Sequence, residues 1–170
     1  MSFRTYNAVF VTERPFTRQY YAWNGKKERY EVRVLKARLT CNPENLFCER
    51  VNLAGGLPAL WQHGDWTRPP AVGKVLEMKF VGRKLVGTIE INEGNLNKFA
   101  PGGLDALSRG VNSGLSAGMQ FLSQKGGKLR KRDGTFDNPD LFRYGPMNII
   151  EMSLTPTPRL ADCGIKGEVK

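Results

Sequence analysis

The chain has 170 residues, which is enough for one domain with a single core. Hydrophobic residues make up 40% and charged residues 25%, as in ordinary globular proteins, and no apolar run is long enough to cross a bilayer. One histidine and three cysteines (Cys41, Cys48 and Cys163) make a structural zinc site hard to assemble. We therefore expect free thiols, no cofactor and no membrane segment. Residues 1–6 lack the apolar stretch of a secretory signal, which indicates a cytosolic location.

The formal charge of +10 raises the question of nucleic-acid binding, because Lys and Arg neutralise phosphates. The basic residues are mostly dispersed, however, and the one dense cluster, residues 125–132, lies next to glycines and contains no aromatic residue to stack on a base. We expect an exposed loop there, either simply solvated or attractive to an acidic protein partner. Specific nucleic-acid binding is not expected.

Strand patterns dominate the first half of the chain. Residues 7–12 are rich in strand formers, and residues 29–40 alternate for much of their length, as a half-buried strand does. Residues 42–45 predict a turn or the start of a short helix, with Pro43 at a first-turn position. Two further strand patterns, residues 72–80 and 84–91, flank Val81-Gly82-Arg83 and predict a hairpin.

Residues 95–110 form the best helical pattern, which Pro101-Gly102-Gly103 should divide in two. Strand patterns follow at residues 114–122 and 148–154. These elements predict one mainly β domain with a few helices (α+β) over residues 1–158. Residues 159–170 are interpreted as a polar C-terminal tail, serving as a trimming or tethering segment.

A candidate nucleophile lies in the strand predicted at residues 114–122. Leu115, Ala117 and Met119 should form its apolar face, so that Ser116 projects from the opposite face. The glycines on either side, Gly114 and Gly118, would leave room for a substrate backbone. Many serine-glycine strands show the same pattern, so this segment alone does not define a site.

A serine hydroxyl needs a neighbouring base, and His63 is the one histidine available. It follows a short apolar run and precedes Gly64-Asp65, which places it at a strand end. Its ring would need a carboxylate on the other nitrogen. Glu151 lies within an apolar strand pattern, where a carboxylate is costly without a partner, unless it shares a wet face with Ser153. Asp65 is the rival, although its position favours a turn.

Five stretches of the chain, taken together, resemble the prohead maturation proteases of tailed phages. The resemblance spans about residues 55–160, and His63, Ser116 and Glu151 follow one another in the family's order. Each motif is weak alone, but the ordered set is fairly specific. The matching stretches are residues 58–65, 73–75, 87–91, 114–119 and 150–158.

The resemblance implies a serine endopeptidase with His63 as base, Ser116 as nucleophile and Glu151 as the acid that orients the histidine. It also implies a fold like that of the herpesvirus assemblins, a small closed or nearly closed β-barrel surrounded by helices. Those relatives use a second histidine as the third catalytic residue, which this chain does not have.

The substrates implied are the phage scaffold protein or scaffold domain and the N-terminal region of the major capsid protein, cut inside the assembling prohead in the host cytoplasm. Self-cleavage is also implied, and self-association stays open. The oxyanion hole is unassigned, with backbone amides near residues 114–118 or Arg143 as candidates. Two other readings remain: a non-catalytic barrel of the same fold that binds capsid or scaffold, and a basic nucleic-acid-binding barrel.

Overall fold

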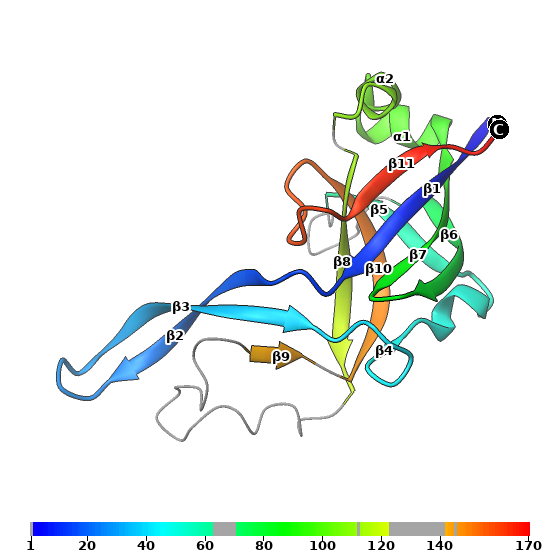
Figure 1. Cartoon of the computed structure of the whole chain (residues 1–170). Coiled ribbons are helices and arrows are strands. Elements are labelled where there is room, and N and C mark those ends of the chain that lie inside the picture. Colours follow the sequence, from blue (N-terminus) through cyan, green and yellow to red (C-terminus); the bar gives the residue numbers. More distant parts are fainter. Residues whose placement is uncertain (1, 63–70, 112, 123–141, 145) are drawn as a thin grey trace.

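The computed structural model describes residues 2–62, 71–111, 113–122, 142–144 and 146–170. Within these ranges the protein is mainly β with few helices, which confirms the mainly β part of the predicted fold class (Figure 1). The strands are β1 (Phe3–Thr12), β2 (Phe16–Asn24), β3 (Arg29–Leu39), β4 (Leu46–Phe47), β5 (Leu57–Trp61), β6 (Ala71–Val81), β7 (Lys84–Asn92), β8 (Gly114–Phe121), β9 (Phe142–Tyr144), β10 (Met147–Thr155) and β11 (Gly164–Glu168). The helices are the 3₁₀ turn η1 (Glu49–Asn52), α1 (Glu93–Phe99) and α2 (Gly103–Ser108).

Seven strands close into a β-barrel, in the order β10-β5-β6-β7-β1-β11-β8, with β8 pairing back onto β10. Most of these pairs are antiparallel, whereas β5 runs parallel to β10. Closure pairs most of these strands on both edges, which reduces the strand edge available for aggregation.

The inside of the barrel is filled by alternate residues of each strand. In β7, Leu85, Gly87, Ile89 and Ile91 are buried while the residues that alternate with them are partly exposed, as the period-two pattern predicts. Phe10 of β1 and Leu96 of α1 are also fully buried in this core. The helix α1 therefore closes part of the barrel through one apolar side chain.

The predicted hairpin and the broken helix are both confirmed. Val81 pairs with Lys84, so that β6 and β7 are joined by a two-residue turn in which Gly82 adopts a positive φ of 57°. The helical region is divided between α1 and α2, and Gly102 has a positive φ of 76° at the break. Asn92 caps α1 by accepting a hydrogen bond from the Asn95 amide.

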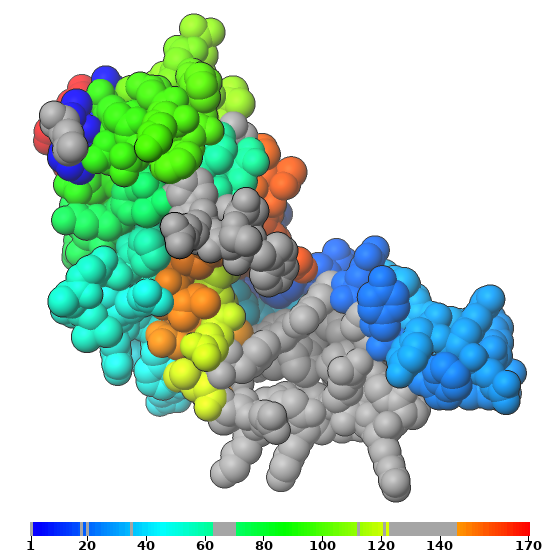
Figure 2. All heavy atoms as spheres, turned by 180° about the vertical axis from the view of Figure 1, so that it is seen from behind, coloured from blue at the N-terminus to red at the C-terminus, as the bar shows by residue number. Residues whose placement is uncertain are grey.

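A two-stranded ribbon, β2 and β3, projects from the barrel (Figures 1 and 2). Its base is joined by β9, which pairs in parallel with residues 37–39 of β3. The sequence patterns predict β3 but not β2, because the residues of β2 do not alternate between polar and apolar. Large side chains are exposed on one face of the ribbon: Tyr21, Trp23, Tyr30, Val32 and Val34.

The segment expected to be a polar tail is part of the barrel. Residues 164–168 form β11, which pairs with β1 along four positions and with β8 at Gly114. Leu160 and Cys163 lie in the core. The sequence pattern misses this strand because β11 is held mainly by backbone pairing and carries few apolar side chains.

The three cysteines are free thiols, as expected. None of the helices that the described ranges contain is long and apolar enough to span a bilayer. The basic cluster at residues 125–132 lies outside the described residues.

Candidate active site

Two of the three predicted catalytic residues come together on neighbouring strands. β8 and β10 are antiparallel, and their register places Ser116 opposite Ser153 and Gly118 opposite Glu151. Ser116 and Glu151 are thus diagonal neighbours on one face of the strand pair. Diagonal neighbours lie about 7–8 Å apart at the backbone, which leaves room for one imidazole between an alcohol and a carboxylate.

A bulge in β10 turns Glu151 toward the face that carries Ser116. Ile149 and Met152 are both fully buried although they are three residues apart, because the register shifts between Ile149 and Glu151. After the bulge, Met152 and Leu154 point into the core, and Glu151 and Ser153 point away from it.

The apolar face predicted for β8 is confirmed. Leu115 is 1% exposed, and Ala117 and Met119 pack against the core while they remain partly exposed. Ser116, which alternates with them, is partly buried on the other face of the strand.

The side chain of Glu151 is held from two sides. The Ser153 hydroxyl donates a hydrogen bond of 3.2 Å to Glu151 Oε2, and Ser153 itself is fully buried. Glu151 also lies directly over Gly118, where any β-carbon would overlap its side chain. Gly118 is therefore the residue that makes space for the carboxylate.

The sequence pattern left open that Glu151 shares a wet face with Ser153, because residues two apart lie on the same face of a strand. The structure places both residues on one face, but Ser153 is fully buried there, and its hydroxyl, to which sequence reasoning assigned no role, holds Glu151. The burial and hydrogen bond of Ser153 depend on neighbouring strands and only the structure reveals them.

His63 and Asp65 lie outside the described residues, but the structure describes the chain up to Gln62, directly before His63. β5 pairs in parallel with β10, with Leu60 opposite Ser153 and Trp61 opposite Leu154. Gln62 then donates its amide to the Leu154 carbonyl at 2.9 Å and adopts a positive φ of 51°. The chain thus leaves the sheet one residue before His63, on the strand next to the one that holds Glu151.

Among the residues that the structure describes, the second edge of β8 is largely unpaired. Of the described strands, only β11 pairs with this edge, at Gly114, where the Leu115 amide donates to the Cys163 carbonyl. Successive residues of a strand direct their N–H groups to opposite edges, so Ala117 and Met119 present their backbone groups on the same side as Leu115. This edge is able to accept an extended peptide.

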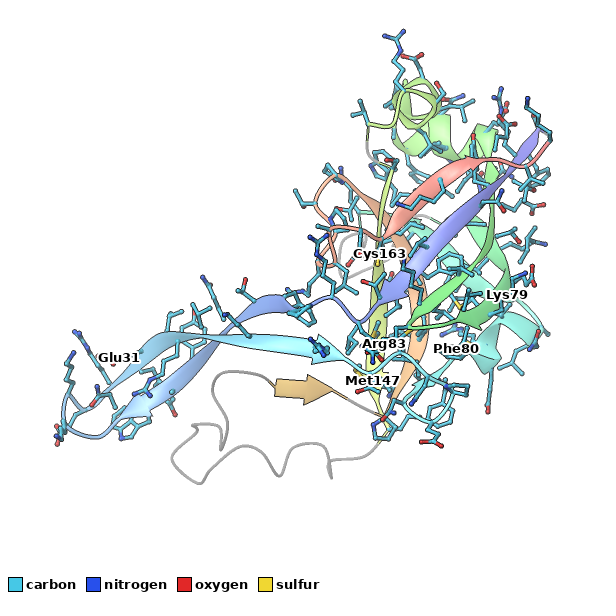
Figure 3. The ribbon with its side chains drawn as sticks, in the orientation of Figure 1. Glu31, Lys79, Phe80, Arg83, Met147 and Cys163 are labelled. Atoms are coloured by element: carbon cyan, nitrogen blue, oxygen red, sulfur yellow. The ribbon has the colours of Figure 1, made fainter. Side chains whose placement is uncertain are left out.

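A cavity of about 320 Å³ lies beside this edge, between β8, the base of the ribbon and the loop between β10 and β11. A volume of this order suits a small ligand or a large side chain. Its lining is apolar except for Ser116 and Arg159. Met147, one of the apolar lining residues, is labelled in Figure 3. The lining residues are Phe10, Phe16, Leu39, Leu115, Ser116, Ala117, Met119, Met147, Arg159 and Leu160.

The two buried cysteines, Cys41 and Cys163, do not offer an alternative nucleophile. Burial raises the pKa of both the Cys41 and the Cys163 thiol to about 12, and these side chains are 2% and 3% exposed. A buried thiol of this kind is inert, since the thiolate is the reactive form.

Of the oxyanion-hole candidates, the amides of β8 lie in the described strand. Arg143 belongs to β9, which pairs with β3 at the base of the ribbon, and its side chain lies outside the described residues.

The described residues define a mainly β protein with a closed barrel, in which a serine and a carboxylate share one face of a strand pair. A scan of protein-family models, a search of curated proteins and a search of solved structures found no match to this chain.

Proposed function

We propose that the protein is a serine endopeptidase of the prohead maturation kind, with Ser116 as nucleophile, His63 as base and Glu151 as the carboxylate that orients His63. The observation that carries the proposal is the β8–β10 register, which sets Ser116 and Glu151 diagonally on one face. The chain path through β5, which ends beside Leu154, supports the same assignment. The closed barrel, one feature of the herpesvirus assemblin type of fold that the sequence resemblance implies, also supports the proposal.

In this mechanism the Ser116 hydroxyl attacks the carbonyl carbon of the scissile peptide bond and passes its proton to the His63 ring. The ring returns that proton to the departing amine as the C–N bond breaks, which leaves an acyl ester on Ser116. Water then attacks the ester carbonyl and gives a proton to His63, and His63 passes that proton to Ser116 Oγ as the ester C–O bond breaks and the acid product leaves. Glu151 accepts a hydrogen bond from the other ring nitrogen and stabilises the imidazolium.

The open edge of β8 is the proposed seat of the substrate. An extended peptide would pair with the backbone of Ala117 and Met119, while one of its apolar side chains entered the cavity beside them. The Ala117 amide, directly after the nucleophile, is the best placed backbone donor for the oxyanion. The substrates proposed are the scaffold and the N-terminal region of the capsid protein, cut within the prohead, together with the enzyme itself.

The test is the substitution Ser116→Ala in the full chain. Loss of the nucleophile should lower cleavage of the scaffold, and of the chain itself, by about 10⁴-fold or more. The melting temperature should stay close to that of the wild type, because the hydroxyl lies on the face away from the core. Ser113→Ala is the matched control and should retain activity.

A fluorophosphonate probe separates this proposal from a non-catalytic barrel that only binds capsid or scaffold. The proposal expects the probe to label the wild type at Ser116 and not the Ser116→Ala variant. A wild-type protein that takes up no probe, in proheads and in isolation, would support the non-catalytic barrel.

A further inference from the structure

The ribbon formed by β2 and β3 exposes an apolar stripe that the proposed chemistry does not use. We define the stripe by Trp23, Tyr30, Val32 and Val34, whose exposed fractions are 44%, 68%, 54% and 61%. Trp23 lies opposite Tyr30, and Val32 and Val34 follow along the same face of β3. Contiguous exposed apolar groups of this kind mark an interaction surface.

The stripe has a definite shape. The rings of Trp23 and Tyr30 pack edge to face, with centroids 5.2 Å apart and planes inclined at 66°. Beyond them, Val32 and Val34 present branched aliphatic groups. A partner must therefore cover aliphatic as well as aromatic surface, which polypeptide side chains do better than stacked bases.

The charges around the stripe are strongly positive. Residues 16–39 contain seven Lys or Arg and two Glu. One of the two, Glu31, accepts from Lys27 at 3.0 Å, so part of the small negative charge is already neutralised within the ribbon. Lys26 and Lys36, one at the turn and one toward the base, are both exposed. The stripe thus lies between exposed cations.

This charge distribution indicates which kind of partner binds the stripe. A second copy of the chain would bring another positive ribbon against the first, in a protein whose formal charge is already +10, and like charges at an interface are unfavourable. An acidic partner would be attracted to the same surface.

We propose that the β2–β3 ribbon is a docking arm for an acidic protein segment whose apolar side chains cover Trp23, Tyr30, Val32 and Val34, and whose carboxylates pair with the lysines beside the stripe. The stripe lies on the outer part of the ribbon, beyond the base whose Phe16 and Leu39 line the cavity beside β8, so this docking is independent of whether Ser116 is catalytic (Figure 1).

The experiment selects binding peptides from a displayed library of random segments of about 12 residues. The library is first depleted on the full-length Tyr30→Ser/Val34→Ser variant and then selected on the full-length wild type. We expect recovered peptides to carry more Asp and Glu than Lys and Arg, together with apolar residues. A synthetic copy of a recovered peptide should bind the double variant about tenfold more weakly than the wild type.

Two further variants make the result specific. Leu53→Ser/Val81→Ser removes exposed apolar side chains outside the ribbon and should leave the peptide affinity unchanged. Lys26→Glu/Lys36→Glu keeps the apolar stripe but reverses the flanking charge, and should weaken binding by about fivefold or more at low salt. Circular dichroism and thermal melting confirm that each variant is folded.

Several outcomes would overturn the proposal. They are recovery of no peptide, recovery of neutral or basic peptides, and equal binding by the wild type and the Tyr30→Ser/Val34→Ser variant. Binding of a thymidine oligonucleotide of about 20 residues that is lost in this variant would assign the arm to nucleic acid instead. If sedimentation showed that the wild type is a dimer and the same variant a monomer, the arm would be assigned to contact with a second copy of the chain.

Discussion

At the scale of single residues, the close approach of Gly118 and Glu151 makes the candidate site sensitive to substitution. Glu151 occupies the space where a β-carbon of residue 118 would lie. Gly118→Ala should push the carboxylate from its place beside Ser153 and cost about 1–3 kcal/mol of stability. Misplacing the orienting carboxylate should lower proteolytic activity by about 100-fold.

The matched control is Gly167→Ala in β11, because a methyl group at Gly167 meets no atom within 4 Å. Activity and melting temperature of Gly167→Ala should match the wild type. If Gly118→Ala cleaves scaffold and reacts with fluorophosphonate at the wild-type rate, Glu151 is not the orienting residue.

The buried thiols give a second prediction at this scale. Burial raises the pKa of Cys41 and of Cys163 to about 12, whereas Cys48, whose pKa is also raised by burial, is more exposed. At about pH 8, iodoacetamide should alkylate Cys48 first and leave the other two unmodified until the protein is denatured. Mass spectrometry of peptides gives the order, and rapid labelling of Cys41 or Cys163 in the native protein would contradict it.

The positions of the site residues could be predicted in part from the sequence. Alternation along β8 placed Ser116 on the face opposite Leu115, and the structure agrees because a strand has a fixed period of two. The bulge at Ile150 was not predictable, since it depends on the register with β8 and not on the residue type. That bulge is what brings Glu151 to the face of Ser116.

At the scale of elements, the ribbon has a pH-dependent contact toward its outer end, where Figure 3 marks Glu31. Hydrogen bonds from Asn24 and Lys27 lower the pKa of the Glu31 carboxyl from its ordinary value near 4.5 to about 2. A lowered pKa in the folded state stabilises the fold above pH 4.5, and this stabilisation is lost as the pH falls from about 4.5 toward about 2.

We therefore expect amide protection factors at Trp23 and Tyr30 to decrease through this pH range, as measured by hydrogen exchange. Glu31→Gln is the control, because its amide still accepts from Asn24 but carries no charge to titrate. Its protection should be lower at neutral pH and nearly constant through the range. Equal pH profiles for the wild type and Glu31→Gln would show that the carboxylate does not hold the ribbon end.

Other elements follow from local chemistry. The β6–β7 turn was predictable from Gly82, which takes the positive φ that a tight turn requires, and the helix break from Pro101 and Gly102. β2 and β11 were not predictable, because neither carries an alternating apolar pattern. β2 forms because its backbone pairs with β3, and β11 forms because its backbone pairs with β1 and β8, which lie far away in the sequence.

At the scale of the whole molecule, β11 completes the barrel between β1 and β8. Deletion of residues 164–170 should open this join and expose core residues such as Phe10 to water. We expect the melting temperature to fall by at least about 10 °C, or the cooperative transition to disappear. Calorimetry or circular dichroism measures either result.

The shorter deletion of residues 169–170 is the control, because it removes the chain after β11 and leaves β11 itself intact, at the cost of the backbone hydrogen bond from the Val169 amide to the Thr5 carbonyl. Its melting temperature should stay within a few degrees of the wild type. If the longer deletion were equally harmless, residues 164–170 would be a dispensable tail after all.

The sequence by itself determined the mainly β class, the β6–β7 hairpin, the divided helix and the facing of Ser116, because these depend on side-chain period and on the backbone preferences of Gly and Pro. Only the tertiary structure decided the closure of the barrel, the strand role of residues 164–168, the projection of the ribbon and the meeting of Ser116 with Glu151 and Ser153. These features arise from pairing between strands far apart in the chain, and the register of such pairs is set by the packing of the whole barrel.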